Sequence, residues 1–179
     1  MGVSSSPCVG PLLALLLVAP GGAVDLKERL SRHVGIWQGT YTHWSPEGEL
    51  LERHQSRQVV ELDGDRWSQT LTFTWSDGRT RTERYDATFV DGELRFDHPE
   101  LFGETHVVSD TIVVFRAGWR SRPGLSVVET IVTVDDDYQT RSWQLFEKGR
   151  LARVVAIEEQ RRSAPPDPGS QPAVVARGR

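Results

Sequence analysis

Turn-forming residues interrupt the chain at short, regular intervals between residues 36 and 160, and this spacing restricts the possible folds more than any other feature. Runs of alternating apolar and polar residues lie between the turns, a period of two that indicates half-buried strands. Asp–Gly and related pairs readily adopt the positive φ angles that tight hairpins need. The turn signals are residues 45–48, 63–65, 76–78, 91–92, 109–110, 135–137 and 148–149.

The runs between these turns predict ten sequential strands with short connections. Their approximate ranges are 36–44, 49–62, 66–75, 79–90, 93–98, 103–108, 111–117, 125–134, 138–147 and 150–160. An antiparallel sheet of this kind removes its exposed edges most completely by closing on itself. The sequence therefore predicts an all-β fold, an antiparallel up-and-down β-barrel of about ten strands.

One short helix is expected before the first strand. Asp25 can cap it, with Glu28 three residues later as in a capping box, and Gly35 is placed to end it. Its apolar stripe consists of Leu26, Leu30 and Val34. The helix would close one end of the barrel, and Trp37 would plug that end above it.

The two ends of the chain differ in composition from its middle. Residues 11–20 are an apolar run followed by small residues, which predicts a signal peptide over 1–23, cleaved after Ala23. An organelle-targeting leader or an uncleaved tail are the alternatives, so we expect a secreted or organelle-targeted protein. The run is too short to span a bilayer, and no stable membrane insertion of the mature domain is expected. Residues 163–179 are rich in Pro, Gly and Ser and are expected to be disordered, leaving a barrel domain over 25–162.

Charge and cysteine content exclude several classes of function. The net charge of −4 argues against a nucleic-acid partner, because binding a phosphate backbone calls for a basic surface. Cys8 is the only cysteine, which excludes an intrachain disulfide and a multi-cysteine metal site. The 179 residues, 37% of them hydrophobic, are enough for one domain with one core. The sequence does not specify an oligomeric state.

Side chains on the inward faces of the strands form the candidate ligand site. On the opening strand Gly39 shares a face with Trp37, Tyr41 and His43, and it suggests a bend or a close backbone approach. The inward aromatic side chains would line a pocket for an apolar or planar ligand, or would simply fill a barrel core. The candidates are Trp37, Tyr41, Trp67, Phe73, Trp75, Tyr85 and Phe89, together with the polar Gln69.

Charged residues interrupt three of the inward faces. Glu129 lies on an otherwise apolar face, Arg141 shares a face with Trp143, and Arg153 interrupts an apolar run. A buried carboxylate and arginine should pair, because an unpaired buried charge is costly. The pair would orient a ligand carboxylate or carbonyl, or else one arginine, with Arg153 favoured, would close over Trp37 at the base. Alternation leaves open which arginine faces inward.

The histidines and the common catalytic motifs predict no metal ion, no cofactor and no catalytic residue. A hairpin closed by residues 45–48 places His54 opposite Gly39 rather than His43, so the two histidines make a poor metal pair. His98 and His106 could approach each other near Glu100 or Glu104, but no metal-binding spacing supports them. The sequence has no nucleophile elbow and no phosphate-binding loop, so only acid–base chemistry by Glu129 with a rim histidine stays open.

Several segments resemble known proteins. The Gly35-x-Trp37 step between a short helix and an antiparallel meander resembles the calycin superfamily, which includes the lipocalins. Four blocks are similar to a lipocalin-like family of unknown function from cyanobacteria and algae, and they cover most of residues 36–160: WQGTYTHWSPEGEL, DRWSQTLTFTWSDGR, DGELRFDHPELFGE and TRSWQLFEKGRL. The resemblance implies a ten-stranded barrel with an internal cavity and brings no established activity.

The superfamily neighbours set the hypotheses for function. Phycobilin lyases hold a tetrapyrrole in the barrel, and nitrobindin-like proteins bind heme through a histidine in the last strand region. Here that region reads LARVVAIEEQ, without a histidine, which argues against heme. We expect a binding or carrier protein for a small hydrophobic or planar ligand. The alternatives are a pigment lyase-like or isomerase-like enzyme using the same cavity, and a filled barrel with a structural or interaction role.

Overall fold

The computed structural model describes residues 25–96 and 98–163, so the predicted leader (1–23) and nearly all of the predicted tail lie outside the described residues. One helix precedes ten strands. The elements are α1 (Leu26–Ser31), β1 (Gly35–Trp44), β2 (Leu50–Asp63), β3 (Arg66–Thr74), β4 (Thr80–Val90), β5 (Glu93–Phe96), β6 (Leu101–Ser109), β7 (Ile112–Trp119), β8 (Leu125–Thr133), β9 (Tyr138–Glu147) and β10 (Arg150–Arg162).

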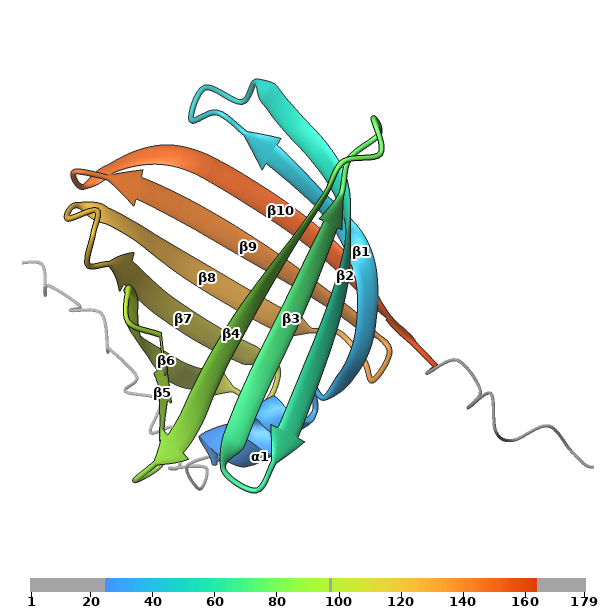
Figure 1. The fold of residues 1–179 in the computed structure, drawn as a ribbon, viewed down its shortest axis with the longest axis vertical. Coiled ribbons are helices and arrows are strands. Elements are labelled where there is room, and N and C mark those ends of the chain that lie inside the picture. The colour runs from blue at the N-terminus through green and yellow to red at the C-terminus, as the bar shows by residue number, and fades with distance from the viewer. Residues whose placement is uncertain (1–24, 97, 164–179) are drawn as a thin grey trace, which may run out of the picture.

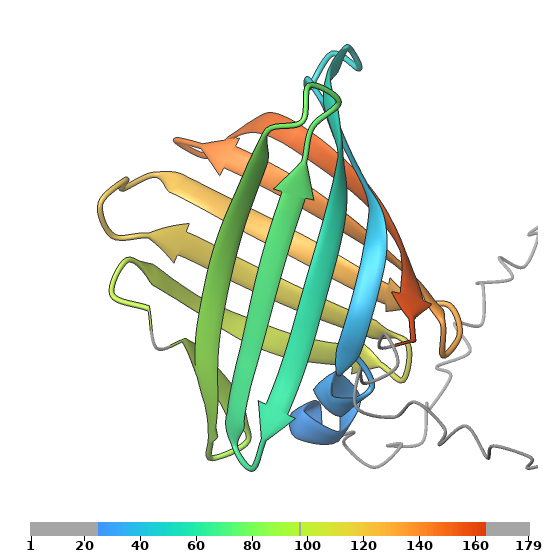
Figure 2. The same ribbon diagram turned by 45° about the vertical axis from the view of Figure 1, so that its right-hand side comes forward.

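The ten strands form one antiparallel sheet that coils into a nearly closed barrel (Figures 1 and 2). The order across the sheet is β5-β4-β3-β2-β1-β10-β9-β8-β7-β6, so β1 pairs with β10 and the two edges are β5 and β6. This confirms the predicted all-β, up-and-down barrel. Among the described residues, no helix has the length and apolar character needed to cross a membrane.

The helix α1 lies against the lower end of the barrel in Figure 1. The Asp25 side chain accepts hydrogen bonds from the backbone N–H groups of Lys27 (2.7 Å) and Glu28 (3.3 Å), which confirms the predicted N-cap. The predicted end at Gly35 is wrong, because the helix ends at Ser31 and Gly35 starts β1 with a φ of +131°. The apolar stripe is therefore one turn shorter than predicted.

An arginine closes over Trp37 at the base of the barrel, but it is Arg161 rather than Arg153 or Arg141. Its guanidinium carbon lies 4.3 Å from the centre of the Trp37 ring. The same group donates hydrogen bonds to the carbonyl oxygens of Arg32 (2.6 Å) and Val34 (2.5 Å) just after α1. The prediction was wrong because the expected last strand ended at residue 160, whereas β10 continues to Arg162. Arg161 thus ties the end of the helix to the last strand.

The inward and outward faces follow the predicted alternation. On β3, Trp67, Leu71 and Phe73 are buried, while Thr74 between Phe73 and the turn is exposed. Buried apolar side chains form three clusters inside the barrel, one beside α1, one around Tyr41 and one around Leu101. The core is therefore divided into three parts, one of which includes the apolar residues of α1.

Gly39 is a point of close backbone approach, as predicted. A Cβ atom built there would lie 2.1 Å from the backbone oxygen of Glu158 and 2.7 Å from the Cγ of Glu159 on β10. Contacts this short cannot be accommodated without moving one strand relative to the other. Glycine is thus needed where β1 pairs with β10 and closes the sheet.

Gly39→Ala should lower the free energy of unfolding by about 1–3 kcal/mol, because the added methyl group overpacks the contact between β1 and β10. Urea unfolding followed by circular dichroism would measure this loss. Gln38→Ala, on the exposed neighbouring residue, is the matched control and should change stability by less than about 0.5 kcal/mol. Equal stability of the two variants would contradict the close approach.

Candidate functional site

The barrel encloses a cavity of about 400 Å³ that extends from Leu30 and His33, near α1, to the exposed Arg81 and Arg122 at the other end. Its volume falls within the range of small-molecule sites, about 300–1,000 Å³. Much of its wall is aromatic or aliphatic. The apolar lining includes Trp67, Leu71, Leu94, Phe96, Val113, Phe115, Val127, Trp143, Leu145 and Val155.

Arg141 is the centre of a polar network on one wall of the cavity. Its Nε donates to Glu129 Oε1 at 2.5 Å, and Nη1 lies 3.4 Å from both carboxylate oxygens of Glu159. Nη1 also donates to Tyr41 Oη at 3.3 Å and to Gln58 Oε1. These acceptors lie on β8, β10, β1 and β2, so one guanidinium on β9 links five strands. The predicted pairing of Glu129 with an arginine is present, and Arg141 is that arginine.

The charge on Arg141 is compensated where it lies. Burial opposes the charged guanidinium, but Glu129, Tyr41 and Glu159 outweigh burial and raise the pKa of Arg141. Burial also raises the pKa of Tyr41 well above its usual value, so the phenol remains protonated. Because the protein's own groups occupy most of its donors, Arg141 has little capacity left to bind a ligand carboxylate.

The network continues toward α1 through Gln139 and determines which ring nitrogen of His33 carries the proton. Gln139 Nε2 donates to Glu159 Oε2 at 2.7 Å, and its Oε1 lies 2.7 Å from His33 Nδ1. The amide oxygen can only accept, so Nδ1 must carry the proton and Nε2 of the neutral ring is an acceptor. Burial, with smaller effects from Arg29, Arg141 and Arg161, lowers the pKa of His33 to about 4 despite the hydrogen bond to Gln139.

Five cavity-lining residues carry a buried polar atom that has no hydrogen-bond partner among the described residues. They are His33 (Nε2), His43 (Nε2), Trp67 (Nε1), Thr105 (Oγ1) and Trp143 (Nε1). Most buried polar atoms in native proteins are paired, so each exception calls for an explanation. An indole N–H can only donate, so Trp67 and Trp143, which both line the cavity, each carry a donor that no acceptor of the described residues pairs.

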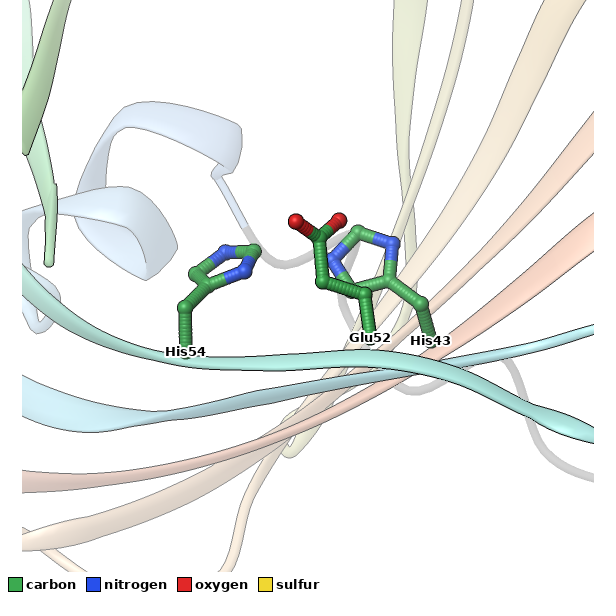
Figure 3. Close-up of side chains that lie close together, drawn as sticks. All are labelled: His43, Glu52 and His54. Atoms are coloured by element: carbon green, nitrogen blue, oxygen red, sulfur yellow. The ribbon is translucent and has the colours of Figure 1, made fainter. Parts of the chain in front are cut away.

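A second polar cluster lies near the other end of the barrel, where the histidine prediction was wrong. His54 lies opposite Tyr41, not Gly39, and His43 lies opposite Glu52. Figure 3 shows that the side chains of His43, Glu52 and His54 come together on one side of the strands. Trp75 Nε1 donates to Glu52 Oε1 at 2.5 Å and thereby lowers the pKa of Glu52. Burial, then His54 and Arg153, lowers the pKa of His43 to about 4.

His98 and His106, which the sequence left free to approach each other, do not form a cluster. The ring nitrogen Nδ1 of His98 accepts hydrogen bonds from the backbone N–H groups of Glu100 and Leu101, each at 3.2 Å. His106 lies on the exposed surface, 3.6 Å from Glu104. His98 therefore shapes the connection before β6, and His106 is a surface residue.

The predicted ligand-binding residues divide into two groups. Six of the ten line the cavity: Trp67, Gln69, Tyr85, Glu129, Arg141 and Arg153. Both arginines face inward, which answers the question that alternation left open. The other four do not line the cavity. Trp37 donates a hydrogen bond to the backbone of His33, and Tyr41 accepts one from Arg141. Phe73 and Trp75 pack against the ring of His54.

Several polar residues of the cavity and its network were not predicted. Gln58, Gln139 and Glu159 join the network around Arg141, and His33 lies at the end near α1. A signal for two of them was present, because Gln139 precedes Arg141 by two residues and Glu159 follows Ile157 by two, so each shares an inward face. His33 precedes the first strand, where no alternation indicates its direction.

The pH dependence of stability should report on His33. Its pKa of about 4 lies below the usual 6.5, so the unfolded chain takes up the proton first as pH falls. The neutral, buried His33 ring makes its full contribution to the free energy of unfolding above pH 6.5. This contribution should decline by about 3 kcal/mol as the pH falls to 4. Urea unfolding at several pH values would show a shallower dependence for His33→Gln. His106→Gln is the exposed control, and identical slopes for the two variants would contradict the assignment.

The compensated charge of Arg141 gives a second prediction. Arg141→Met leaves two buried carboxylates without their cation and should cost about 3–5 kcal/mol in unfolding free energy. Glu129→Gln should cost less, because Glu159 still faces the guanidinium. Arg95→Met removes an arginine whose ion pairs with Asp91 and Glu93 are exposed, and it should cost less than about 1 kcal/mol. Thermal or urea unfolding that ranks Arg141→Met with Arg95→Met would refute this role.

Comparison with known proteins supports the predicted family and fold. The N-terminal domain of DUF3598, a domain of unknown function, matches residues 27–164. A DUF3598 protein of unknown function from Nostoc punctiforme has a similar structure, with a TM-score of 0.62 and 17% identity over 74% of this chain. The match covers 49% of that protein, so this chain spans about half of its length.

Two other solved structures share the barrel. The S-type phycobiliprotein lyase CPES of Guillardia theta has a TM-score of 0.65 and 14% identity, over 79% of this chain and 94% of that protein. Rv2717c of M. tuberculosis has a TM-score of 0.56 and 18% identity, over 79% and 99%. At these identities the similarity establishes the fold alone. No curated protein matches the chain.

Proposed function

We propose that this chain, which belongs to the family of the DUF3598 N-terminal domain, is a binding protein that holds one small, largely apolar molecule inside its barrel. The observation that carries the proposal is the set of unpartnered donors on Trp67 and Trp143 at the wall of a cavity of about 400 Å³. A barrel that only packed its own core would fill this space and pair these atoms.

The lining indicates the chemistry of the ligand. Aromatic side chains on several strands favour a flat, apolar body. The indole N–H groups favour hydrogen-bond acceptors on that body, such as carbonyl oxygens or ring nitrogens. His33 Nε2 is an acceptor near α1, so a donor on the inner end of the ligand would complete the set.

The cavity mouth favours a polar or anionic outer end. Arg81, Arg122 and Arg153 line this region, and Glu83 is their one acidic counterpart among the lining residues there. Glu83 is already engaged, because it pairs with Arg81 and accepts a hydrogen bond from Tyr85 Oη at 2.8 Å. The remaining positive charge would attract a carboxylate and hold it near solvent.

A lyase-like role is the second candidate. It is favoured by the barrel shared with the phycobiliprotein lyase of Guillardia theta, although at 14% identity this similarity extends only to the fold. A lyase would transfer its ligand covalently to a second protein, whereas a carrier would release it unchanged. Recovery of the chemically unaltered ligand after incubation with candidate acceptors would separate the two roles.

Trp67→Phe and Trp143→Phe should each weaken binding of the planar, anionic probe 1-anilinonaphthalene-8-sulfonate by about three- to tenfold. Each change keeps an aromatic ring but removes one hydrogen bond worth about 1 kcal/mol. Fluorescence titration of the full chain would measure the effect. Without probe, neither variant should be much less stable, because the donor that is lost had no protein partner.

Trp44→Phe is the matched control for these variants. Trp44 lies on the exposed face of β1 and does not line the cavity, so its substitution should leave the probe affinity unchanged. Ala117→Phe should fill part of the cavity and reduce binding further. Unchanged binding in Trp67→Phe, Trp143→Phe and Ala117→Phe together would overturn the proposed site.

A further inference from the structure

Three potential metal ligands converge at the end of the barrel away from α1. His43 on β1 pairs with Glu52 on β2, and His54 lies on the same inward face as Glu52. One possible ligand atom from each of the three side chains lies within 4.8 Å of the other two. Figure 3 shows the carboxylate of Glu52 directed toward the space between the two imidazole rings.

Both imidazole rings have ring nitrogens that the protein leaves unpaired. His43 is 9% and His54 6% exposed. Within the described part of the chain, His43 Nε2 and His54 Nδ1 are buried and have no hydrogen-bond partner. A buried polar atom without a partner costs free energy, and a ring lone pair that binds a cation would no longer be unsatisfied.

The surroundings hold the three side chains in position. The His54 ring stacks on Tyr41, with a centroid distance of 5.4 Å and an angle of 18°, and packs against Phe73 at 5.1 Å. The hydrogen bond from Trp75 Nε1 orients the carboxylate of Glu52. Outer groups of this kind usually fix the direction of metal ligands. The cluster therefore has ligands and also supporting contacts.

We propose that His43, Glu52 and His54 bind a divalent transition-metal ion of the Zn²⁺ type. Two imidazole nitrogens and one carboxylate oxygen suit Zn²⁺ and its neighbours, whereas Mg²⁺ and Ca²⁺ prefer oxygen ligands. Ligand atoms about 2.1 Å from a tetrahedral ion lie roughly 3.4 Å apart, so small side-chain rotations would complete the site. Three protein ligands leave a fourth position for water or another molecule.

The site would adjoin the ligand cavity. His43 lines the cavity wall, so an ion bound to its ring lies next to the enclosed space. A carboxylate or carbonyl oxygen of the bound molecule could then take the fourth position. This last step rests on the proposed function, whereas the metal site itself does not.

Arg153 is the group that most directly opposes a cation at this site. Its Nη1 can only donate to His43 Nδ1, at 3.4 Å, so this contact places the ring proton on Nε2, and the ion would bind Nε2 only after the proton moves to Nδ1 and Arg153 turns away. The positive charge of Arg153 also weakens the binding of another cation. Arg153→Gln should therefore tighten metal binding by about three- to tenfold. If the three side chains had only a structural role and bound no ion, Arg153→Gln would not increase the affinity for a metal ion.

Titration of the full chain with Zn²⁺ by calorimetry tests the proposal, with Cys8→Ser included so that the lone thiol is excluded as a ligand. We expect one ion per chain. His43→Gln, His54→Phe and Glu52→Gln should each weaken binding at least about tenfold, and His106→Gln, at an exposed histidine, should leave it unchanged. Co²⁺ should give the intense visible absorption of a four-coordinate site, lost in the same variants.

Two results would overturn the proposal. One is the absence of stoichiometric Zn²⁺ binding by the folded wild-type chain. The other is binding that survives in Glu52→Gln and in whichever histidine variant keeps the wild-type circular dichroism spectrum. Glu52→Gln keeps the shape of the side chain and an oxygen that can accept from Trp75, so it should fold and provides a decisive variant even if a histidine variant does not.

Discussion

The charge of Arg141, buried within the barrel, is the interaction on which the interior depends. Arg141 is only 5% exposed, and a buried guanidinium is tolerated only where carboxylates and other acceptors surround it. Here they come from β1, β2, β8 and β10. Each acceptor must face inward, so the network is compatible with one strand register and opposes a one-residue slip. The network also continues through Gln139 to His33 and thereby links the middle of the barrel to its base.

This network leaves the cavity with two kinds of wall. On one wall, arginine, carboxylates and amides form hydrogen bonds and ion pairs with one another. No charge in the network is left unpaired, and few of its hydrogen-bonding groups remain free to bind a ligand. The rest of the lining is apolar except for single donors that the protein does not satisfy, on Trp67 and on Trp143, which lies beside Arg141. The division suits a mostly apolar guest fixed by a few hydrogen bonds. The arginines that line the mouth are Arg122, Arg153 and Arg81, the last of which pairs with Glu83.

Much of the fold was predictable because turn chemistry and alternation are local properties. The ten strands, the cap at Asp25 and the inward face of β3 follow from residues close together in the sequence. The errors came from features that local patterns do not encode. The hairpin register differs from the prediction by two residues: Ser45 rather than Trp44 lies opposite Glu49, and a bulge between His43 and Trp44 adds the second residue, which brings His43 opposite Glu52. Arg161 was missed because the end of β10 could not be placed from alternation alone.

The site was predictable only in part for the same reason. Glu129 and Arg141 each interrupt an apolar face, so their pairing could be inferred. Gln139 and Glu159 lie opposite each other on β9 and β10 and were signalled by alternation, whereas His33 precedes β1 and meets Gln139 only in the folded barrel. The sequence also could not show which aromatic residues line a cavity and which pack behind it. Trp67 and Tyr41 have similar patterns, yet only Trp67 lines the cavity.

Native mass spectrometry of the protein purified from the organism that produces it would test the ligand-holding interior most directly. A cavity built to hold one molecule predicts a single discrete mass above that of the polypeptide, present once per chain and released on denaturation. A bare polypeptide mass under the gentlest conditions, together with no uptake of planar probes by the same sample, would contradict a binding role for the interior.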